Sequence, residues 1–528
     1  MTDIRFGTDG WRGVIADDFT FANVRLVARA IARRVRAEVG GRTPHVLVGH
    51  DTRFLSREFA QAAAEAMAGE GVQVSLTAAF APTPAFSYAV VRLRAAGAVV
   101  ITASHNPAEY NGVKFKSGFG GSAPVPFTRS VEEEIRRLRA ESRAGGGSAQ
   151  RIRLAPDPPE ADREPRAASH QPGAASREPR AGTPKFEIRN SKFEIGTFDP
   201  REPWLDRLEE LVDVSRIGRS GIRVALDVMY GAGQGLLSER LGKAGAEVRE
   251  LHGEINPGFG GLHPEPIPAY MGALMDCVKG WGGSALRVGF AFDGDSDRVA
   301  PVDEDGIVVT PHQTLALLVR HLVQQRGMRG AVVKSVNIGH LVDAEVKALG
   351  LPLVVTPVGF KFIAEAMRKH DAVVGGEESG GFAVRGHIPE RDPGLISLLL
   401  LECMAMTGKS LGTLVREMEA QHGPHRYDRL DLRLPSLEAR DQVVAATVAS
   451  PPGQVLSLPV RQVETMDGVK LTRADHSWVM LRASGTEPLL RIYAEAPTEG
   501  EGPGGASARW RRVPATRSSA WWSSRGAG

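Results

Sequence analysis

Short apolar strand patterns alternate with helical patterns along most of this chain, and the alternation limits the folds open to it. Residues 45–48 and 98–102 are strand-like, and the Ala-rich segment 56–67 between them has helical spacing. From residue 310 the same alternation resumes and continues to about residue 374. Repeated strand–helix units of this kind predict an α/β fold, in which helices cover a largely parallel sheet.

Length and texture divide the chain into four ordered blocks. A chain of 528 residues corresponds to about three or four domains at roughly 100–200 residues per domain. After residue 422 the pattern of apolar residues changes to short stretches of alternating apolar and polar residues around one helical pattern, which is typical of a smaller α+β domain. We therefore predict three α/β domains over 1–140, 197–303 and 304–422, and an α+β domain over 423–500.

Two segments differ in composition from these blocks. Residues 141–196 are rich in Arg, Ala, Pro, Gly and Ser, and they contain two copies each of REPRA and KFEI. Such a stretch buries too little apolar surface to offset its ordering entropy, so we predict a disordered insertion rather than a docking arm. Residues 501–528 carry five Arg and three Trp without a helical period. For this atypical tail we predict disordered or non-native sequence, with nucleic-acid binding as the alternative.

Charge balance and cysteine count exclude several classes of protein. Lys and Arg number 65 and Asp and Glu 62, and the net charge of +3 is too small to indicate nucleic acid or an anionic membrane as partner. The two cysteines, Cys277 and Cys403, cannot form a disulfide framework or a four-cysteine zinc site. No apolar run of about 18 residues and no signal-peptide core are present. We expect a cytoplasmic protein without a membrane-spanning helix.

The densest polar motif is DGDSDR at 293–298. Asp293, Asp295 and Asp297 are spaced so that their carboxylates can converge on one hard cation where the backbone turns. A calcium loop also begins with this spacing, but it requires glycine at its sixth position, where Arg298 stands, and helices on both sides. Strand patterns flank this motif instead. We predict a Mg²⁺ site at a strand end, with a solvated acidic turn as the alternative.

A second polar motif, TASHNP at 102–107, directly follows a buried strand pattern. Active-site groups of α/β sheets lie in loops at the carboxyl ends of strands. Ser104 is therefore a candidate nucleophile or phosphate acceptor. A serine hydrolase would have glycines at the positions that Thr102 and Asn106 occupy. A hydrogen-bonding loop serine or a helix cap is the remaining alternative.

Two further loops carry groups suited to a phosphate and a sugar. RASGTEP at 482–488 offers an arginine, hydroxyls and backbone N–H groups for a phosphate, and Arg491 follows on the next strand pattern. GEES at 376–379 offers carboxylates and a hydroxyl to sugar hydroxyls. A polar hairpin turn and an acidic helix start are the alternatives for the two loops.

Together these motifs resemble those of the α-D-phosphohexomutases, the phosphoglucomutase/phosphomannomutase family. The motifs stand in the family's order, and the resemblance covers residues 1–140 and 197–496. The motifs are FGTDGWRG (6–13), TASHNP with NGVK (111–114), DGDSDR, GEES and RASGTEP.

The resemblance implies a four-domain architecture with one loop from each domain meeting in a central cleft. It implies that Ser104 carries a phosphoryl group and, with the three aspartates, holds Mg²⁺. It places four further residues around that phosphate: Arg12, His105, Lys114 and Arg298. It assigns the sugar hydroxyls and the non-reacting phosphate to Gly359, Glu377, Ser379, Arg482, Ser484, Gly485, Thr486 and Arg491.

The implied reaction moves a phosphate between O1 and O6 of a hexose through the enzyme phosphoserine. A hexose 1,6-bisphosphate is then the bound intermediate and activator, and a hexose phosphate is the substrate. The resemblance leads us to expect a monomer or weak dimer. Phosphoryl transfer depends on positioning and on charge neutralisation, which the predicted residues supply.

Two departures from the family pattern bear on specificity and activity. Relatives often have a histidine where this chain has Gly381, and Glu378 resembles the GEES form of many phosphoglucomutases. We therefore favour glucose phosphate, with mannose phosphate possible and glucosamine phosphate as the alternative. The segment 387–392 resembles one that carries a catalytic base in some relatives. Members of the family continue after residue 496 with a helix that packs on the last domain, and the tail of this chain has no such helical pattern. A catalytically impaired relative that binds sugar phosphates is therefore a further alternative, and a metal-dependent phosphatase is a minor one.

Overall fold

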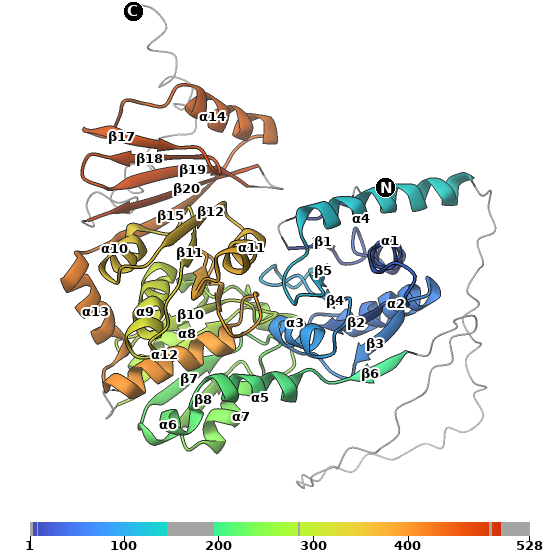
Figure 1. The fold of residues 1–528 in the computed structure, drawn as a ribbon, viewed down its shortest axis with the longest axis horizontal. Helices are drawn as coiled ribbons and strands as arrows, with labels where there is room; N and C mark the ends of the chain where they lie inside the picture. The colour runs from blue at the N-terminus through green and yellow to red at the C-terminus, as the bar shows by residue number, and fades with distance from the viewer. Residues whose placement is uncertain (1–3, 8, 145–194, 283–285, 485–487, 498–528) are drawn as a thin grey trace, which may run out of the picture.

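The computed structural model describes residues 4–7, 9–144, 195–282, 286–484 and 488–497. Most of the predicted insertion, Gly485 and Thr486 of the candidate phosphate loop, and the tail lie outside these residues. Figure 1 shows four groups of strands and helices, with the first at the right of the view and the last sheet at the upper left.

The first group is a mixed six-stranded sheet in the order β1-β5-β4-β2-β3-β6, with helices on both faces. Helices α1, α2 and α4 share one apolar cluster with the sheet, while α3 packs on the opposite face. Strand β6 pairs with β3, so the chain returns to the first sheet before the second block begins. The elements are β1 (Trp11–Val14), α1 (Phe21–Val39), β2 (His45–His50), α2 (Ser56–Gly69), β3 (Gln73–Thr77), α3 (Thr83–Arg92), β4 (Gly97–Ile101), β5 (Tyr110–Ser117), α4 (Val125–Ala144) and β6 (Gly196–Phe198).

The second group is a four-stranded sheet in the order β10-β9-β7-β8, in which only β10 runs antiparallel to its neighbour. Its helices begin with α5, which packs against α3 of the first group. The elements are α5 (Arg201–Leu211), α6 (Val214–Arg219), β7 (Arg223–Asp227), α7 (Leu236–Lys243), β8 (Glu247–Leu251), α8 (Gly272–Lys279), β9 (Arg287–Phe292) and β10 (Val299–Val302), with short 3₁₀ turns at Phe259–Gly261 and Pro268–Tyr270.

The third group repeats this design in a sheet of order β12-β11-β13-β14, where β14 is the antiparallel strand. The elements are α9 (Pro311–Gln324), β11 (Val332–Ser335), α10 (His340–Ala348), β12 (Leu353–Thr356), α11 (Phe360–His370), β13 (Val374–Gly376), β14 (Phe382–Val384), α12 (Pro393–Thr407) and α13 (Leu411–His422).

The last group is an antiparallel sheet in the order β15-β20-β19-β18-β17-β16, and α14 packs against its central strands. The elements are β15 (Arg426–Arg433), α14 (Leu437–Ala449), β16 (Gln454–Val455), β17 (Leu458–Glu464), β18 (Val469–Arg473), β19 (Trp478–Ala483) and β20 (Leu489–Ala496). Three mixed α/β sheets followed by a smaller α+β unit confirm the predicted fold class.

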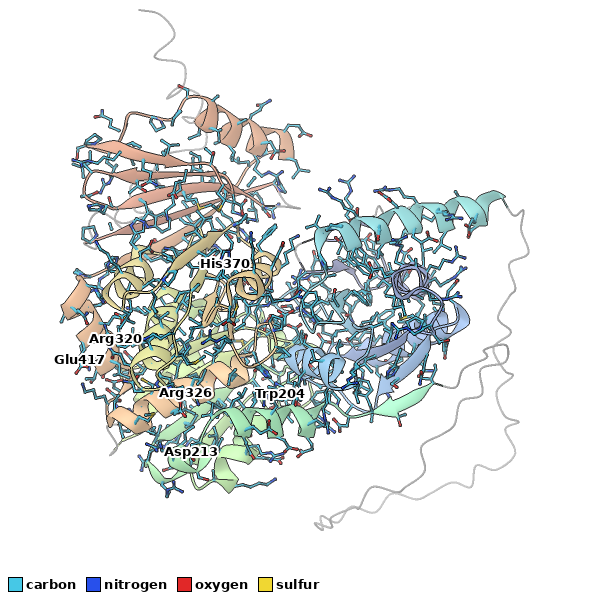
Figure 2. All side chains as sticks on the ribbon, viewed as in Figure 1. Trp204, Asp213, Arg320, Arg326, His370 and Glu417 are labelled. Atoms are coloured by element: carbon cyan, nitrogen blue, oxygen red, sulfur yellow. The ribbon has the colours of Figure 1, made fainter. Side chains whose placement is uncertain are left out.

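Helix α12 joins the groups because it is apolar on all sides and therefore lies in the interior. It contacts α5, α6, α9 and β14, and nearly all of its side chains are buried. Asp392 caps its first turn by accepting from the N–H of Leu395, and Pro393 takes the first helical position. The indole N–H of Trp204, labelled in Figure 2, donates to Asp392 at 2.7 Å, which fastens α5 to the start of α12.

Within the described part of the chain, no single helix has the length and apolar character needed to cross a membrane. Helices α12 and α13 meet that test only as a pair, with a bend of 80° between them.

Candidate active site

The candidate loops follow the carboxyl ends of strands in three of the sheets. Strand β4 leads to Ser104, β9 leads to Asp293, and β13 leads to Glu377. Backbone groups and side chains at such strand ends are free to face a ligand, as is general for α/β sheets.

Ser104 is buried and lies against the acidic motif of the second group. Its hydroxyl donates to Asp293 Oδ2 at 2.7 Å, and its N–H donates to the hydroxyl of Thr102 at 2.8 Å. The φ of Ser104 is +56°, a left-handed conformation that non-glycine residues rarely adopt. Because the surrounding contacts hold this conformation, the hydroxyl is presented to Asp293 rather than to its own backbone.

Arg53, which the sequence analysis did not select, shapes the Ser104 loop. Its buried guanidinium donates to the carbonyls of Ser104 (2.6 Å), Asn106 (2.5 Å), Pro107 (2.7 Å) and Tyr110 (3.0 Å). A planar fork with several fixed donors can satisfy this many carbonyls, whereas a point charge cannot. The available signal was its position just after strand 45–50, which matches the position of Ser104 after its own strand.

The three aspartates fit a divalent cation. Their carboxylate oxygens lie within 4.8 Å of one another, and all three residues are buried. Asp295 Oδ1 and Asp297 Oδ1 are buried without a hydrogen-bond partner among the described residues. Burial, followed by the charges of Asp297 and Asp295, raises the pKa of Asp293 to about 8. Converging hard oxygens with unmet bonding capacity are the donor set that Mg²⁺ prefers.

Lys114 supplies the nearest positive charge to these carboxylates. It lies on β5, and its Nζ donates to Asp295 at 2.7 Å and to Asp297 at 2.6 Å. Although burial alone would raise the pKa of Asp295, the ammonium of Lys114 lowers it below its ordinary value. The same ammonium lies 3.0 Å from Asp9 of the motif that precedes β1. Lys114 thus connects that motif with the metal loop.

Arg12, His105 and Arg298 complete the surroundings of Ser104. Arg12 donates to the side-chain oxygen of Asn106 in the Ser104 loop. Arg298 lies 3.9 Å from Asp297. Burial, followed by the charges of Arg298 and Arg12, holds the pKa of His105 well below its usual value, so its imidazole is neutral near pH 7. The charges of these two guanidiniums and of Lys114 all act on His105, the residue next to Ser104, so they can offset the charge of a phosphoryl group carried by this loop.

Arg391, also not selected from the sequence, ties the third group to this centre. Its Nη2 lies 2.8 Å from Asp297 and donates to Asp9, and its Nη1 lies 3.6 Å from Glu377. A Cβ at Gly381 would lie 2.4 Å from the Cδ of Arg391. The glycine that replaces the histidine of many relatives therefore leaves room for this arginine.

The segment 387–392, which resembles one that carries a catalytic base in some relatives, places its histidine in a structural contact. The ring of His387 lies 2.9 Å from Asp392, the residue that caps α12, and it stacks on Tyr88. Within the described residues, His387 has no contact with Ser104 or the aspartates, and Arg391 is the residue of this segment that reaches them.

The candidate sugar loop lies beside Arg391. Ser379 donates to Glu377 at 2.6 Å, and burial raises the pKa of Glu377. The neighbouring Glu378 turns instead toward the last group, where its carboxylate lies 3.7 Å from Arg429. Gly359 has a φ of +130° and directly precedes α11, a conformation for which glycine is suited.

The candidate phosphate loop pairs two arginines. Arg482 and Arg491 face each other as register partners on β19 and β20. Like charges directly opposite each other destabilise a sheet unless counter-charges are present. Here Asp467 lies 2.9 Å from Nε of Arg482 and Asp431 lies 3.9 Å from Nε of Arg491. Ser484 closes the hairpin by donating its N–H to the carbonyl of Leu489 at 2.9 Å. Gly485 and Thr486 lie outside the described residues.

The structure therefore brings together Ser104, the three aspartates, Arg12, His105, Lys114 and Arg298, and it adds Glu377 and Ser379 through Arg391. Among the described residues, Arg482, Ser484 and Arg491 make no direct contact with that centre.

Comparison with known proteins agrees with this four-part organisation. Four family models match in chain order: the α/β/α domains I, II and III of phosphoglucomutase/phosphomannomutase over residues 3–142, 202–306 and 310–421, and its C-terminal domain over 441–502. The chain belongs to the phosphoglucomutase/phosphomannomutase family, the α-D-phosphohexomutases, and the resemblance noted in its sequence is confirmed. The members of this family are mutases, which are isomerases.

Individual relatives carry different substrate names. A phosphoglucosamine mutase of Moorella thermoacetica is 31% identical, with 94% of this chain and 96% of the relative aligned. A phosphoglucomutase/phosphomannomutase of Thermococcus kodakarensis is 28% identical, with 94% and 95% aligned. The crystal structure of a putative phosphomannomutase from Thermus thermophilus is similar with a TM-score of 0.75 and 35% identity, covering 94% of this chain and 96% of that one.

Proposed function

We propose that this protein is a phosphohexomutase that interconverts hexose 1-phosphate and hexose 6-phosphate, with glucose phosphate as the favoured substrate. The observation that carries the proposal is the buried Ser104 hydroxyl, which lies 2.7 Å from Asp293, a carboxylate on which the positive charges of Arg298 and Lys114 act. A phosphate acceptor needs such a set of compensating charges, whereas a structural serine does not.

In the proposed reaction, Ser104 enters the cycle as a phosphoserine. The bond from its Oγ to phosphorus breaks as a bond forms from phosphorus to O6 or O1 of the bound hexose phosphate. The attacking sugar hydroxyl gives up its proton, and Oγ of Ser104 takes up a proton as it leaves. The resulting 1,6-bisphosphate turns over within the site, and its other phosphate returns to Ser104. Arg12, Lys114 and Arg298 neutralise the charge of the transferring group at each stage, and the neutral imidazole of His105 helps to hold it.

Asp293, Asp295 and Asp297, with a phosphoserine oxygen, would hold Mg²⁺. When bound, the cation supplies electrostatic stabilisation of the charge on the transferring phosphoryl group. The buried oxygens of Asp295 and Asp297 that lack hydrogen-bond partners among the described residues support this assignment.

The remaining site residues divide between the sugar and its second phosphate. We assign sugar hydroxyls to Glu377 and Ser379, with Gly359 in the neighbouring loop. We assign the non-reacting phosphate to the last domain, through Arg482, Ser484, Gly485, Thr486 and Arg491. A phosphate site in a separate domain suits the reversal of the bound intermediate within the cleft, since the phosphate at either end of the sugar can occupy that site. We propose that residues 1–140, 197–303, 304–422 and 423–500 are the four domains that contribute these loops.

The identity of the hexose is assigned from the sugar loop. Glu378 gives the sugar loop the GEES form that many phosphoglucomutases share, which favours glucose phosphate. Phosphoglucosamine mutase is the second candidate because several similar proteins bear that name.

The test is incubation of the purified protein with glucose 1-phosphate, Mg²⁺ and a trace of glucose 1,6-bisphosphate, with glucose 6-phosphate as the readout. Parallel reactions with mannose 1-phosphate and glucosamine 1-phosphate rank the substrates. We expect turnover that Ser104→Ala abolishes, together with a phosphorylated Ser104 peptide by mass spectrometry. Release of inorganic phosphate, binding without turnover, or full activity of Ser104→Ala would each contradict the proposal.

A further inference from the structure

One carboxylate oxygen connects the candidate phosphate loop with the candidate sugar loop. Asp467 lies in the turn between β17 and β18 of the last group. Its Oδ2 accepts from Nε of Arg482 at 2.9 Å and from the backbone N–H of Val358 at 2.9 Å. Arg482 belongs to the last group, whereas Val358 belongs to the loop that joins β12 to α11 of the third group.

The contact with Arg482 leaves the outer edge of its guanidinium available. Asp467 uses Nε, and the described residues offer no hydrogen-bond partner to Nη1 or Nη2 of Arg482. A guanidinium that is held at one edge presents its two terminal nitrogens as a fixed fork, the arrangement that binds a phosphate through two parallel hydrogen bonds. Arg491, opposite on β20, adds a second positive charge at the same place.

The contact with Val358 fixes the neighbouring loop. Val358 immediately precedes Gly359, whose φ of +130° sets the entry into α11. An N–H that is bound to a carboxylate cannot rotate toward solvent without losing a charge-assisted hydrogen bond. The single oxygen of Asp467 therefore orders the backbone before Gly359 and the side chain of Arg482 together.

The position of Asp467 is itself constrained. The next residue, Gly468, has a φ of +91°, and a Cβ there would lie 2.2 Å from the carbonyl oxygen of Leu481 on β19. Only glycine permits so close an approach of the turn to β19. The turn is therefore held next to the strand that carries Arg482.

We propose that Asp467 is a positioning residue that aims the Arg482 fork at the non-reacting phosphate and couples the Gly359 loop to it. This inference rests on the proposed phosphohexomutase function. Because the clamp binds the phosphate that does not react, its loss weakens substrate binding more than it slows phosphoryl transfer. A poorly positioned Arg482 also releases the 1,6-bisphosphate before the intermediate has reversed its orientation in the site.

The test compares Asp467→Ala and Asp467→Asn with the control Asp475→Asn. Asp475 lies in the turn between β18 and β19, and its hydrogen bonds go to Ser477 and Arg473 of its own group. We expect Asp467→Ala to raise KM for the hexose 1-phosphate about tenfold, with kcat within about threefold at saturating 1,6-bisphosphate. Asp467→Asn keeps a hydrogen-bond acceptor and should have a smaller effect, while Asp475→Asn should match the native protein.

Hydrogen exchange of peptides that contain Val358 gives a readout that does not require turnover. Exchange should be faster in Asp467→Ala than in the native protein and in Asp475→Asn. An unchanged KM together with unchanged exchange would overturn the inference, as would equal losses in the Asp467→Ala and Asp475→Asn variants.

The two proposals fail in distinguishable ways. A native protein without mutase turnover on any of the hexose phosphates would sink the proposed function. In that case, calorimetric binding of glucose 6-phosphate and hydrogen exchange still test Asp467 as a phosphate-orienting residue. Affinity that is tenfold weaker in Asp467→Ala would support it, and equal affinity would overturn it.

Discussion

Substitution of Gly381 by alanine tests whether the site depends on the position of Arg391. The added Cβ would lie 2.4 Å from Cδ and 2.8 Å from Cγ of Arg391. Ordinary contacts begin at 3.4 Å, so the arginine must withdraw by 3.4 − 2.4 = 1.0 Å. The hydrogen bonds and ion pairs of Arg391 with Asp297, Asp9 and Glu377 oppose that movement.

The magnitude follows from the contacts that the movement disrupts. A shift of 1.0 Å that carries the guanidinium away from these carboxylates stretches its 2.8 Å ion pair with Asp297 to about 3.8 Å and weakens the hydrogen bond of the same nitrogen to Asp9. A hydrogen bond to a charged group contributes about 1.5–3 kcal/mol, and a gain of about 0.4–1 kcal/mol from the loss of glycine flexibility offsets part of it. We expect the unfolding free energy to fall by about 1–2 kcal/mol. A similar loss in the transition state slows turnover about fivefold to thirtyfold.

The assay measures turnover of glucose 1-phosphate and thermal unfolding for Gly381→Ala and for the control Gly272→Ala. A Cβ at Gly272, the first residue of α8, would meet nothing within 4 Å. We expect the melting temperature of Gly381→Ala to fall by about 1–2 °C and that of the control to stay unchanged. Native-like turnover and melting in Gly381→Ala would refute the view that Arg391 is held in place by its carboxylates.

Three further predictions address other parts of the molecule. Burial lowers the pKa of His312 from 6.5 to about 4, and its Nδ1 accepts from the N–H of Gly339 at 2.7 Å, so stability should fall as the pH drops from 6.5 toward 4. The unfolding free energy should be lower by about 2 kcal/mol at pH 5. Urea unfolding at pH 7 and pH 5 measures this difference. An equal pH dependence in His312→Gln would contradict its assignment to His312. Arg53→Lys cannot bind the four loop carbonyls as a fork and should lower kcat about 100-fold, so a kcat within about threefold of native would count against its role. Removal of divalent cations with EDTA should abolish turnover, and Mg²⁺ should restore it. Asp295→Asn should lower kcat far more than it lowers the affinity for substrate, so an unchanged kcat of this variant at limiting Mg²⁺ would exclude the metal role.

The local motifs of the site were predictable because their residues are neighbours in the sequence. Asp293, Asp295 and Asp297 lie within five positions at the end of one strand pattern, and Ser104 directly follows another. Strand ends and dense polar spacing are properties of short segments, so the fold class and these loops could be inferred before any contact was known. The family resemblance added the roles of the remaining residues.

Tertiary contacts alone revealed the residues that hold these loops in place. Arg53 is separated by 51 positions from Ser104, and Arg391 by 382 positions from Asp9. No periodicity or spacing relates such residues, because their proximity arises only when separate sheets pack together. The role of Gly381 also became visible only in the structure. In the sequence it was a departure from the family pattern that bore on substrate preference, whereas in the structure its missing side chain leaves room for Arg391.

The amino-acid sequence by itself determined which elements form and which strand ends carry chemistry, since hydrophobic periodicity and short polar motifs are local properties. Only the tertiary structure decided which charges face one another. A buried carboxylate or guanidinium has no stable state without a partner. The pairing of Asp297 with Lys114 and Arg391 therefore depends on how three separate sheets are oriented around one point.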